Sequence, residues 1–139
     1  MTKAIVPTRI LYTMIRVTDL ERSIRFYVDH LGMQEMRRED YPSGRFTLAF
    51  LGYGDEDQHA VVELTWNWDP QDYDLGNAWG HIALGVEDVA ASIEKLRDGG
   101  VTILRDAGPM MHRSPQRSEV ENIAFFADPD GYRIELVEI

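Results

Sequence analysis

The chain has 139 residues, a length that suits one compact domain with its own hydrophobic core. Its formal net charge is −10, which argues against a nucleic-acid-binding protein, because such proteins need a basic surface. It contains no cysteine, which excludes disulfides and zinc–thiolate centres and leaves histidine, carboxylate, phenolate or water as the ligands of any metal.

The first half of the chain predicts a strand, a helix and three further strands. Residues 8–17 include the alternation of apolar and polar side chains that is typical of a half-buried strand. Residues 18–21, with the sequence Thr-Asp-Leu-Glu, have the pattern of a helix capping box, and Gly32 is expected to end the helix. The three remaining strands are expected over residues 33–40, 45–52 and 60–66.

The second half repeats this order after a polar linker over residues 68–79. A strand is expected over residues 80–86, and Asp88 is the expected cap of a helix that Gly99 ends. The Asp-Pro-Asp-Gly sequence at residues 128–131 is a strong turn signal between the final two strands. The last three strands are expected over residues 101–105, 121–127 and 132–138, with a long loop over residues 107–120.

An internal repeat relates the two halves residue by residue. The matches keep one order along the chain: Tyr12 with His81, Asp19 with Asp88, residues 48–50 with 123–125, and Glu63 with Glu135. An ordered series of this kind fixes the architecture of a protein. The sequence therefore predicts a single α+β domain over residues 1–139, built from two βαβββ modules over about residues 8–67 and 80–139.

The alternation of side chains places the matched residues on one face of each predicted sheet. The apolar residues of the strand over 80–86 must face the helix, and these are Ile82, Leu84 and Val86. His81 therefore faces away from the helix, beside small residues that leave room for a ligand. By the same alternation, Tyr12, Glu63 and Glu135 also face away from the helices.

This shared face predicts a metal site. Two carboxylates and an imidazole on one apolar-walled sheet face are costly unless they are paired or bound to a cation. A divalent metal with nitrogen and oxygen ligands removes that cost. A single strand histidine or glutamate is more often structural or solvent-facing. The repeat of Glu63 in Glu135, with His81 at the partner position of Tyr12, favours a joint site.

Several sequence motifs carry a resemblance to a known family. They are Thr13-Met-Ile-Arg-Val17, Phe26-Tyr27 with Leu31-Gly-Met33, Leu48-Ala-Phe-Leu-Gly-Tyr-Gly54, Glu63-Leu-Thr-Trp-Asn-Trp68, Gly80-His-Ile-Ala83, and Asp128-Pro-Asp-Gly-Tyr132 followed by Glu135-Leu136. With these motifs, residues 11–138 resemble the glyoxalase I (lactoylglutathione lyase) family of the vicinal-oxygen-chelate superfamily. The Asp-Pro-Asp-Gly motif is general to the superfamily, whereas the motifs that begin at Glu63 and Gly80 are specific to the glyoxalase I branch.

The resemblance implies a glyoxalase/bleomycin-resistance-type fold, with curved mixed sheets around a concave site, in a homodimer. Each site would take Glu63 from one chain and His81 and Glu135 from the other, as three of the family's four metal ligands. The implied metal is Ni²⁺ or Zn²⁺, with Co²⁺, Mn²⁺ or iron as alternatives. Arg16 and Asn67 match family positions that hold the γ-glutamyl end of glutathione.

The implied reaction is that of a carbon–sulfur lyase in methylglyoxal detoxification. It converts the hemithioacetal of methylglyoxal and glutathione into S-lactoylglutathione by moving a proton next to a carbonyl. The metal stabilises the enediolate charge as a Lewis acid, while a carboxylate takes the proton from one carbon and returns it to the neighbouring carbon. Glu135 is the preferred base, and Glu63 is the other candidate.

Tyr12 departs from the family pattern, because the first metal ligand of the family is normally histidine. A neutral phenol, with an ordinary pKa of about 10, is a poor ligand for Ni²⁺ or Zn²⁺ at neutral pH. Three interpretations stay open. Waters complete a site with three protein ligands, Tyr12 binds a harder metal as phenolate, or Tyr12 hydrogen-bonds a bound water.

The loop over residues 107–120 is a second departure from the family. It lacks a lysine that is common there for binding glutathione, and Arg113 or Arg117 are candidate replacements. Two alternatives to a lactoylglutathione lyase therefore stay open. One is a related enzyme for another α-oxo or enolisable substrate, and the other is a metal-poor small-molecule binding protein.

No targeting or membrane segment is expected. The N-terminal residues lack the long apolar stretch and the small-residue cleavage site of a secretory signal, and no apolar run approaches the length that spans a bilayer. We therefore expect a cytoplasmic protein that acts on a small molecule, without a nucleic-acid or membrane partner.

Overall fold

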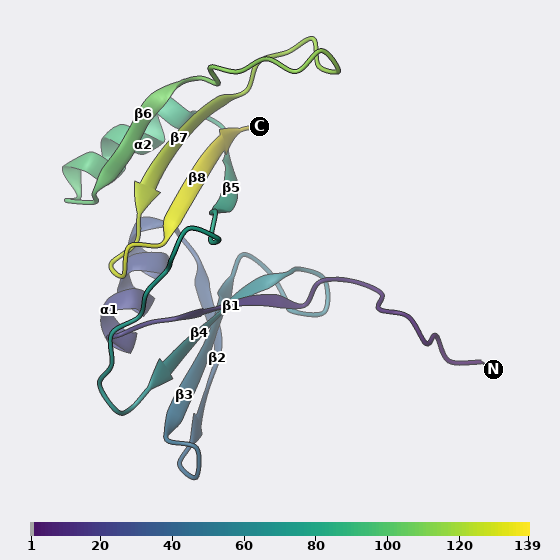
Figure 1. The fold of residues 1–139 in the computed structure, drawn as a ribbon, viewed down its shortest axis with the longest axis vertical. Coiled ribbons are helices and arrows are strands. Elements are labelled where there is room, and N and C mark those ends of the chain that lie inside the picture. The colour runs from purple at the N-terminus through teal and green to yellow at the C-terminus, as the bar shows by residue number, and fades with distance from the viewer. Residues whose placement is uncertain (1) are drawn as a thin grey trace. The chain divides into compact units, whose positions relative to one another are not determined.

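A computed structural model describes residues 2–139 (Figure 1). The chain divides into two compact units, with the boundary between Tyr73 and Asp74. This boundary lies within the predicted linker over residues 68–79. Each unit contains a four-stranded mixed sheet and a helical segment between its first two strands. The predicted α+β class, with two βαβββ modules, is therefore confirmed.

The first unit runs in the order strand, helix and three strands. Its strands are β1 (Tyr12–Arg16), β2 (Gln34–Tyr41), β3 (Phe46–Gly52) and β4 (Val61–Asn67). They lie in the order β1-β4-β3-β2, in which β1 pairs with β4 in parallel and the other pairs are antiparallel. The helix α1 (Leu20–Arg25) continues into a π-helical segment, η1 (Phe26–His30).

The helix of the first unit begins and ends at identifiable side chains. The carboxylate of Asp19 accepts a hydrogen bond from the backbone N–H of Arg22 at 3.1 Å, so Asp19 is the N-cap of α1. The predicted capping box, which places the cap at Thr18, is therefore wrong by one residue, because the neighbouring carboxylate takes that bond. Gly32 follows η1 with a φ of +71°, which confirms the predicted stop.

The second unit has the same order of elements. Its strands are β5 (Ile82–Val86), β6 (Ile103–Pro109), β7 (Asn122–Ala127) and β8 (Arg133–Glu138), in the order β5-β8-β7-β6. The helix α2 (Val89–Asp98) is capped by Asp88, whose carboxylate accepts from the backbone N–H of Ala91 at 2.9 Å, as predicted. Within residues 2–139, every helix is too short or too polar to traverse a bilayer.

Most strand boundaries differ from the sequence predictions by one or two residues, and two differ by four. β1 begins at Tyr12 and not at residue 8, because its partner strand β4 begins directly opposite it. β6 continues to Pro109, paired with β7, so the long loop begins at Met110 and not at residue 107. The predicted turn at residues 128–131 is confirmed, with Gly131 at a φ of +92°.

Each sheet has one buried apolar face and one face that carries polar side chains. The buried apolar side chains of the first unit include Ile15, Val17, Ile24, Tyr27 and Leu64. Those of the second unit include Val89, Ile93, Leu96, Phe126, Ile134 and Leu136. Each such side chain stabilises the fold by roughly 1.5–3 kcal/mol relative to exposure. This burial fixes which side chains of each strand point to the opposite face, where the candidate site residues lie.

Candidate functional site

His81 and Glu135 form a close pair in the second unit. Nε2 of His81 lies 3.2 Å from Oε1 of Glu135, and their side chains are 40% and 15% exposed. His81 directly precedes β5, and Glu135 lies in the middle of β8. Ala83 of β5 is the residue opposite Glu135, so a small side chain leaves the carboxylate free to reach the imidazole.

Phe125 orients the imidazole of this pair. Its ring meets the ring of His81 edge to face, with centroids 5.0 Å apart and an interplanar angle of 80°. Phe125 lies opposite Glu135 in the β7–β8 ladder, so both partners of His81 come from adjacent strands of one sheet. The imidazole is therefore held between an aromatic wall and a carboxylate.

Glu63 is the corresponding carboxylate of the first unit. It is only 8% exposed, and its Oε2 accepts a hydrogen bond from the hydroxyl of Thr65 at 2.8 Å. This bond uses one of the two carboxylate oxygens and fixes the direction of the other. Tyr12 is 42% exposed, and its ring meets the ring of Phe50 at 5.2 Å and 75°.

The two units repeat this arrangement in register. Phe50 faces Glu63 in the first sheet, as Phe125 faces Glu135 in the second. Met14 of β1 faces Glu63, and Tyr12 lies two residues before Met14. In the same way, Ala83 of β5 faces Glu135, and His81 lies two residues before Ala83. The aligned residues thus occupy equivalent places in the two sheets.

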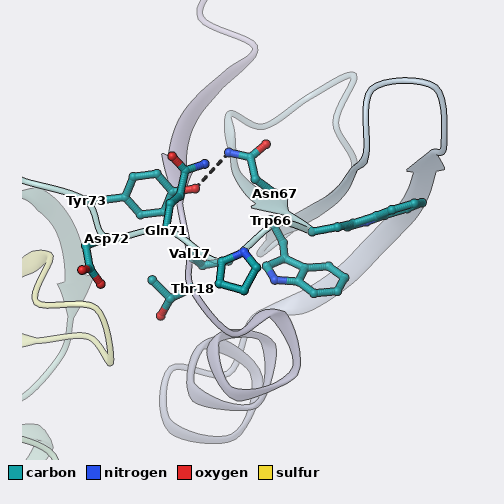
Figure 2. A pocket seen from close by; sticks show the side chains of 9 residues that line it. Val17, Thr18, Trp66, Asn67, Gln71, Asp72 and Tyr73 are labelled. Carbon is teal, nitrogen blue, oxygen red and sulfur yellow. Dashed lines mark hydrogen bonds between the residues drawn. The ribbon is translucent and has the colours of Figure 1, made fainter.

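Asn67 lines a pocket of the first unit with a volume of about 510 Å³ (Figure 2). Its side-chain N–H donates to the hydroxyl of Tyr73 at 2.9 Å, the bond that Figure 2 marks with a dashed line. The other lining residues are Val17, Thr18, Trp66, Trp68, Pro70, Gln71 and Asp72. Arg16 ends β1 opposite Thr65 and is exposed, but it does not line this pocket.

Sequence reasoning missed the contribution of the segment after β4 to this pocket. Gln71, Asp72 and Tyr73 lie in a stretch that the sequence predicted only as a linker. The available signal was Tyr73, an aromatic residue among the polar residues that follow Asn67. The structure shows that this segment returns to the end of β4.

The two arginines of the long loop line one pocket of the second unit. This pocket has a volume of about 500 Å³ and also contains Met110, His112, Ser114 and Glu119. Arg117 forms an ion pair with Glu121, whereas Arg113 adds a second guanidinium to the pocket lining. The candidate replacements for the missing lysine are therefore close together.

Arg37 is a fixed cation on the face that carries Glu63. In the register of the first sheet, Arg37 lies opposite Phe50, and Phe50 lies opposite Glu63. The guanidinium carbon is 3.6 Å from the centroid of the Phe50 ring. Arg37 donates to Glu56 at 2.9 and 3.1 Å and to Glu39 at 2.8 Å, and its bonds to Glu56 lower the pKa of that carboxyl. No sequence motif singled out Arg37.

Comparison with known proteins identifies the family of the chain. A model of the glyoxalase/bleomycin resistance protein/dioxygenase superfamily matches residues 9–136. The chain belongs to this superfamily. A probable lactoylglutathione lyase of Synechocystis sp. is 55% identical over 129 residues, which are 93% of this chain and 94% of the relative. The lactoylglutathione lyase of Neisseria meningitidis serogroup A is 52% identical over 130 residues, which are 94% and 90% of the two chains.

Solved structures place the chain near glyoxalase I within the superfamily. The trypanothione-dependent glyoxalase I of Leishmania major matches with a TM-score of 0.80 and 43% identity, over 95% of this chain and 87% of that chain. Glyoxalase I of Zea mays matches with a TM-score of 0.85 and 38% identity over 94% of this chain. The chain spans only 44% of the maize enzyme's length.

The glyoxalase I family is metal-dependent, and the donor atoms of this chain fit a divalent ion. Two ligands bound at right angles, each about 2.1 Å from an ion, lie about 3.0 Å apart. The 3.2 Å between Nε2 of His81 and Oε1 of Glu135 agrees with that spacing. Glu63 belongs to the first unit and the other two to the second. No group of three or more His, Cys, Asp or Glu side chains gathers as a metal site within residues 2–139.

Proposed function

We propose that the chain is a metal-dependent lactoylglutathione lyase. It isomerises the hemithioacetal of methylglyoxal and glutathione to S-lactoylglutathione. The observation that carries this proposal is the His81–Glu135 pair, with Glu63 at the repeat-equivalent position of Glu135. Relatives named lactoylglutathione lyase, at 55% and 52% identity over nearly the whole chain, support it.

The proposed metal ligands are Glu63, His81 and Glu135, which supply one imidazole nitrogen and carboxylate oxygens. Such a set suits Ni²⁺ or Zn²⁺, and also Co²⁺, Mn²⁺ or iron. The proposed assembly is a homodimer in which each site takes Glu63 from one chain and the other two ligands from its partner. This arrangement would complete a ligand set that is divided between the two units of a single chain.

The chemical step moves one proton between neighbouring carbons of the substrate. Glu135 takes the proton from the carbon that carries sulfur and hydroxyl, and electrons move into the adjacent carbonyl to give an enediolate. The same carboxyl returns the proton to the former carbonyl carbon, and a second proton moves between the two oxygens, which leaves the thioester S-lactoylglutathione. A bound divalent ion supplies Lewis-acid stabilisation of the enediolate charge.

The protein groups around Glu135 suit this role. Its side chain is 15% exposed and therefore shielded from most of the solvent, and His81 fixes its direction. Glu63 is the second candidate for the base, because it is the repeat equivalent of Glu135 and is more deeply buried. The rates of Glu135→Gln and Glu63→Gln variants distinguish the two candidates.

Arg16 and Asn67 are the proposed contacts for the γ-glutamyl end of glutathione. Asn67 lines the pocket of the first unit, where Trp66 and Trp68 provide apolar walls. Arg16 supplies a cation two residues from Thr18, which also lines that pocket. We also propose that the protein acts in the cytoplasm.

A second candidate function is catalysis on another α-oxo or enolisable substrate. Two observations favour it. Tyr12 occupies the first ligand position, and the loop pocket contains Arg113 and Arg117 but not the lysine that is common in the family. A guanidinium binds planar carboxylates in two-pronged geometry, so this loop could recognise a different anionic carrier. The metal-poor binding protein is the third alternative.

One experiment separates these possibilities. Purified protein is loaded with Ni²⁺ or Zn²⁺, mixed with methylglyoxal and glutathione, and assayed for thioester absorbance. The proposal predicts turnover that a chelator abolishes and added metal restores. Turnover of an α-oxo substrate only with another thiol carrier would support the second candidate. Tight small-molecule binding without bound metal or turnover would support the third.

A further inference from the structure

Tyr12 has an aromatic neighbour in the first unit that is equivalent to the neighbour of His81 in the second. Its ring meets Phe50 at 5.2 Å and 75°, and the ring of His81 meets Phe125 at 5.0 Å and 80°. The two residues thus share an aromatic contact and differ in the functional group that each presents beside it. A phenol carries its hydroxyl farther from the backbone than an imidazole carries Nε2. The hydroxyl of Tyr12 is therefore expected to lie farther from the β1 backbone than Nε2 of His81 lies from the backbone before β5.

Glu63 does not need residue 12 to orient it. In the second unit, the carboxylate of Glu135 is held by the imidazole of His81 at 3.2 Å. In the first unit, Glu63 accepts instead from the hydroxyl of Thr65 at 2.8 Å. The residue equivalent to Thr65 is Val137, which has no donor. Thr65 thus orients Glu63, as the imidazole of His81 orients Glu135.

The hydroxyl of Tyr12 is available for a ligand. Among residues 2–139, it makes no hydrogen bond, although Tyr12 is 42% exposed on the site face. The hydroxyls of Tyr41, Tyr53 and Tyr73 are each hydrogen-bonded within the first unit. A hydroxyl donor on a partly exposed ring that packs against a second ring is pre-organised to bind an oxygen acceptor.

We propose that the Tyr12 hydroxyl donates a hydrogen bond to an oxygen of the bound hemithioacetal. The protein ligands of the metal are then only Glu63, His81 and Glu135. This inference rests on the proposed function, because it names one substrate contact of that site. Tyr12 acts as a substrate-positioning residue that holds the α-oxo unit, and the aromatic contact with Phe50 sets its direction.

Tyr12→Phe tests this role because it removes the hydroxyl and keeps the ring against Phe50. The matched control is Tyr41→Phe, which removes the hydroxyl of a similarly exposed tyrosine on the same sheet. Metal affinity is measured by competition with a chromophoric chelator, and kcat/KM with methylglyoxal and glutathione. Tyr12→Phe is expected to lower kcat/KM by about 2- to 12-fold, the loss of one net hydrogen bond. Metal affinity should stay unchanged within about 2-fold in both variants, because neither removes a proposed ligand.

A spectroscopic measurement checks the competing role of Tyr12 as a ligand. Metal is titrated into the wild-type protein and into Tyr12→Phe, and the ultraviolet difference absorbance of phenolate is followed. We expect no phenolate signal in either protein. A signal of one phenolate per metal that disappears in Tyr12→Phe, or a tenfold or greater loss of metal affinity in that variant, would overturn the proposal.

The outcomes separate this inference from the proposed function. If the wild type makes S-lactoylglutathione and Tyr12→Phe has the same kcat/KM, the substrate contact is wrong and the proposed function stands. If the wild type makes none, the proposed function fails, and binding of S-lactoylglutathione is measured by calorimetry. Weaker binding by Tyr12→Phe would still support the contact, whereas equal binding, or none by either protein, would overturn it.

Discussion

Nε2 of His81 lies 3.2 Å from Oε1 of Glu135, and the ring of Phe125, which faces Glu135 on the neighbouring strand, meets the same imidazole edge to face. The two donor atoms come from neighbouring strands of one sheet, so the backbone ladder fixes their separation. The first unit repeats the scaffold with Phe50 and Glu63 but carries a phenol in place of the imidazole.

Removal of His81 tests the proposed ligand set directly. We expect His81→Ala to weaken metal binding by about 100-fold or more, because even groups that only orient a ligand contribute about 10- to 100-fold. His59→Ala is the matched control, since His59 is also exposed but lies in the turn before β4. Competition with a chelator measures both variants. Equal metal affinity in His81→Ala and wild type would contradict the proposed site.

Thr65 is expected to stabilise the fold through Glu63. Thr65→Val removes the hydroxyl that donates to the buried carboxylate and keeps the shape of the side chain. We expect the free energy of unfolding in urea to fall by about 1–2 kcal/mol, because a buried acceptor loses its partner. Thr13→Val, at an exposed position of β1, is the control and should change stability little. An equal effect of both substitutions would argue against the orienting bond.

The sequence and the structure agree where local signals and the repeat determine the outcome. The strand–helix order, the cap at Asp88 and the turn at residues 128–131 follow from short-range chemistry and are confirmed. The alignment of Phe50 with Phe125 also correctly anticipates equivalent places in the two sheets. In all these cases, the interaction that determines the structure joins residues close in the sequence, or it occurs in both halves of the chain.

The remaining features depend on contacts between strands that no local pattern reveals. Thr65 orients Glu63 across one strand face, and Arg37 stacks on Phe50 from the neighbouring strand. Tyr73 reaches Asn67 only because the segment after β4 turns back. Such contacts depend on register and loop path, which a single sequence specifies only through the complete fold.

The Arg37–Glu56 pair predicts a pH-dependent contribution to stability. Arg37 donates two hydrogen bonds to Glu56 and holds the pKa of that carboxyl below its usual range. Because the folded pKa lies below the unfolded one, the pair stabilises the fold above about pH 4.5 and loses this effect as the pH falls. Glu56→Gln should destabilise by about 0.5–1 kcal/mol at pH 7 and by less at lower pH.

Urea unfolding of this variant at pH 7 and near pH 3.5 measures the effect. Asp57→Asn, the adjacent acidic position, is the control and should show no comparable pH dependence. A loss of stability in Glu56→Gln that is as large at low pH as at neutral pH would mean that the effect comes from packing and not from the ion pair.

Asn67 is expected to act on substrate binding more than on the chemical step. Asn67→Ala removes a polar group from the pocket of the first unit and should raise KM by about 10-fold with a smaller change in kcat. Tyr73→Phe removes only the acceptor of the Asn67 bond and should have a weaker effect of the same kind. Steady-state kinetics with varied glutathione hemithioacetal separate the two constants. A fall in kcat alone would place Asn67 elsewhere in the mechanism.

Tyr12→His should convert the first unit into a closer copy of the second. The imidazole would lie against Phe50 as His81 lies against Phe125, and it would add a fourth protein ligand. We expect the dissociation constant for Ni²⁺ to fall by about 10-fold or more in this variant. Unchanged affinity would show that residue 12 is too far from the metal to serve as a ligand in any form.

Glu135, together with His81 and Glu63, is the proposed centre for the isomerisation of a glutathione hemithioacetal. The most direct test is the rate at which Ni²⁺-loaded wild type and Glu135→Gln form S-lactoylglutathione, identified by mass, with and without a chelator. We expect that the wild type forms this product, that the chelator stops it, and that Glu135→Gln loses at least 100-fold of the rate. Full activity in Glu135→Gln, or product formation that the chelator leaves unchanged, would contradict the proposal.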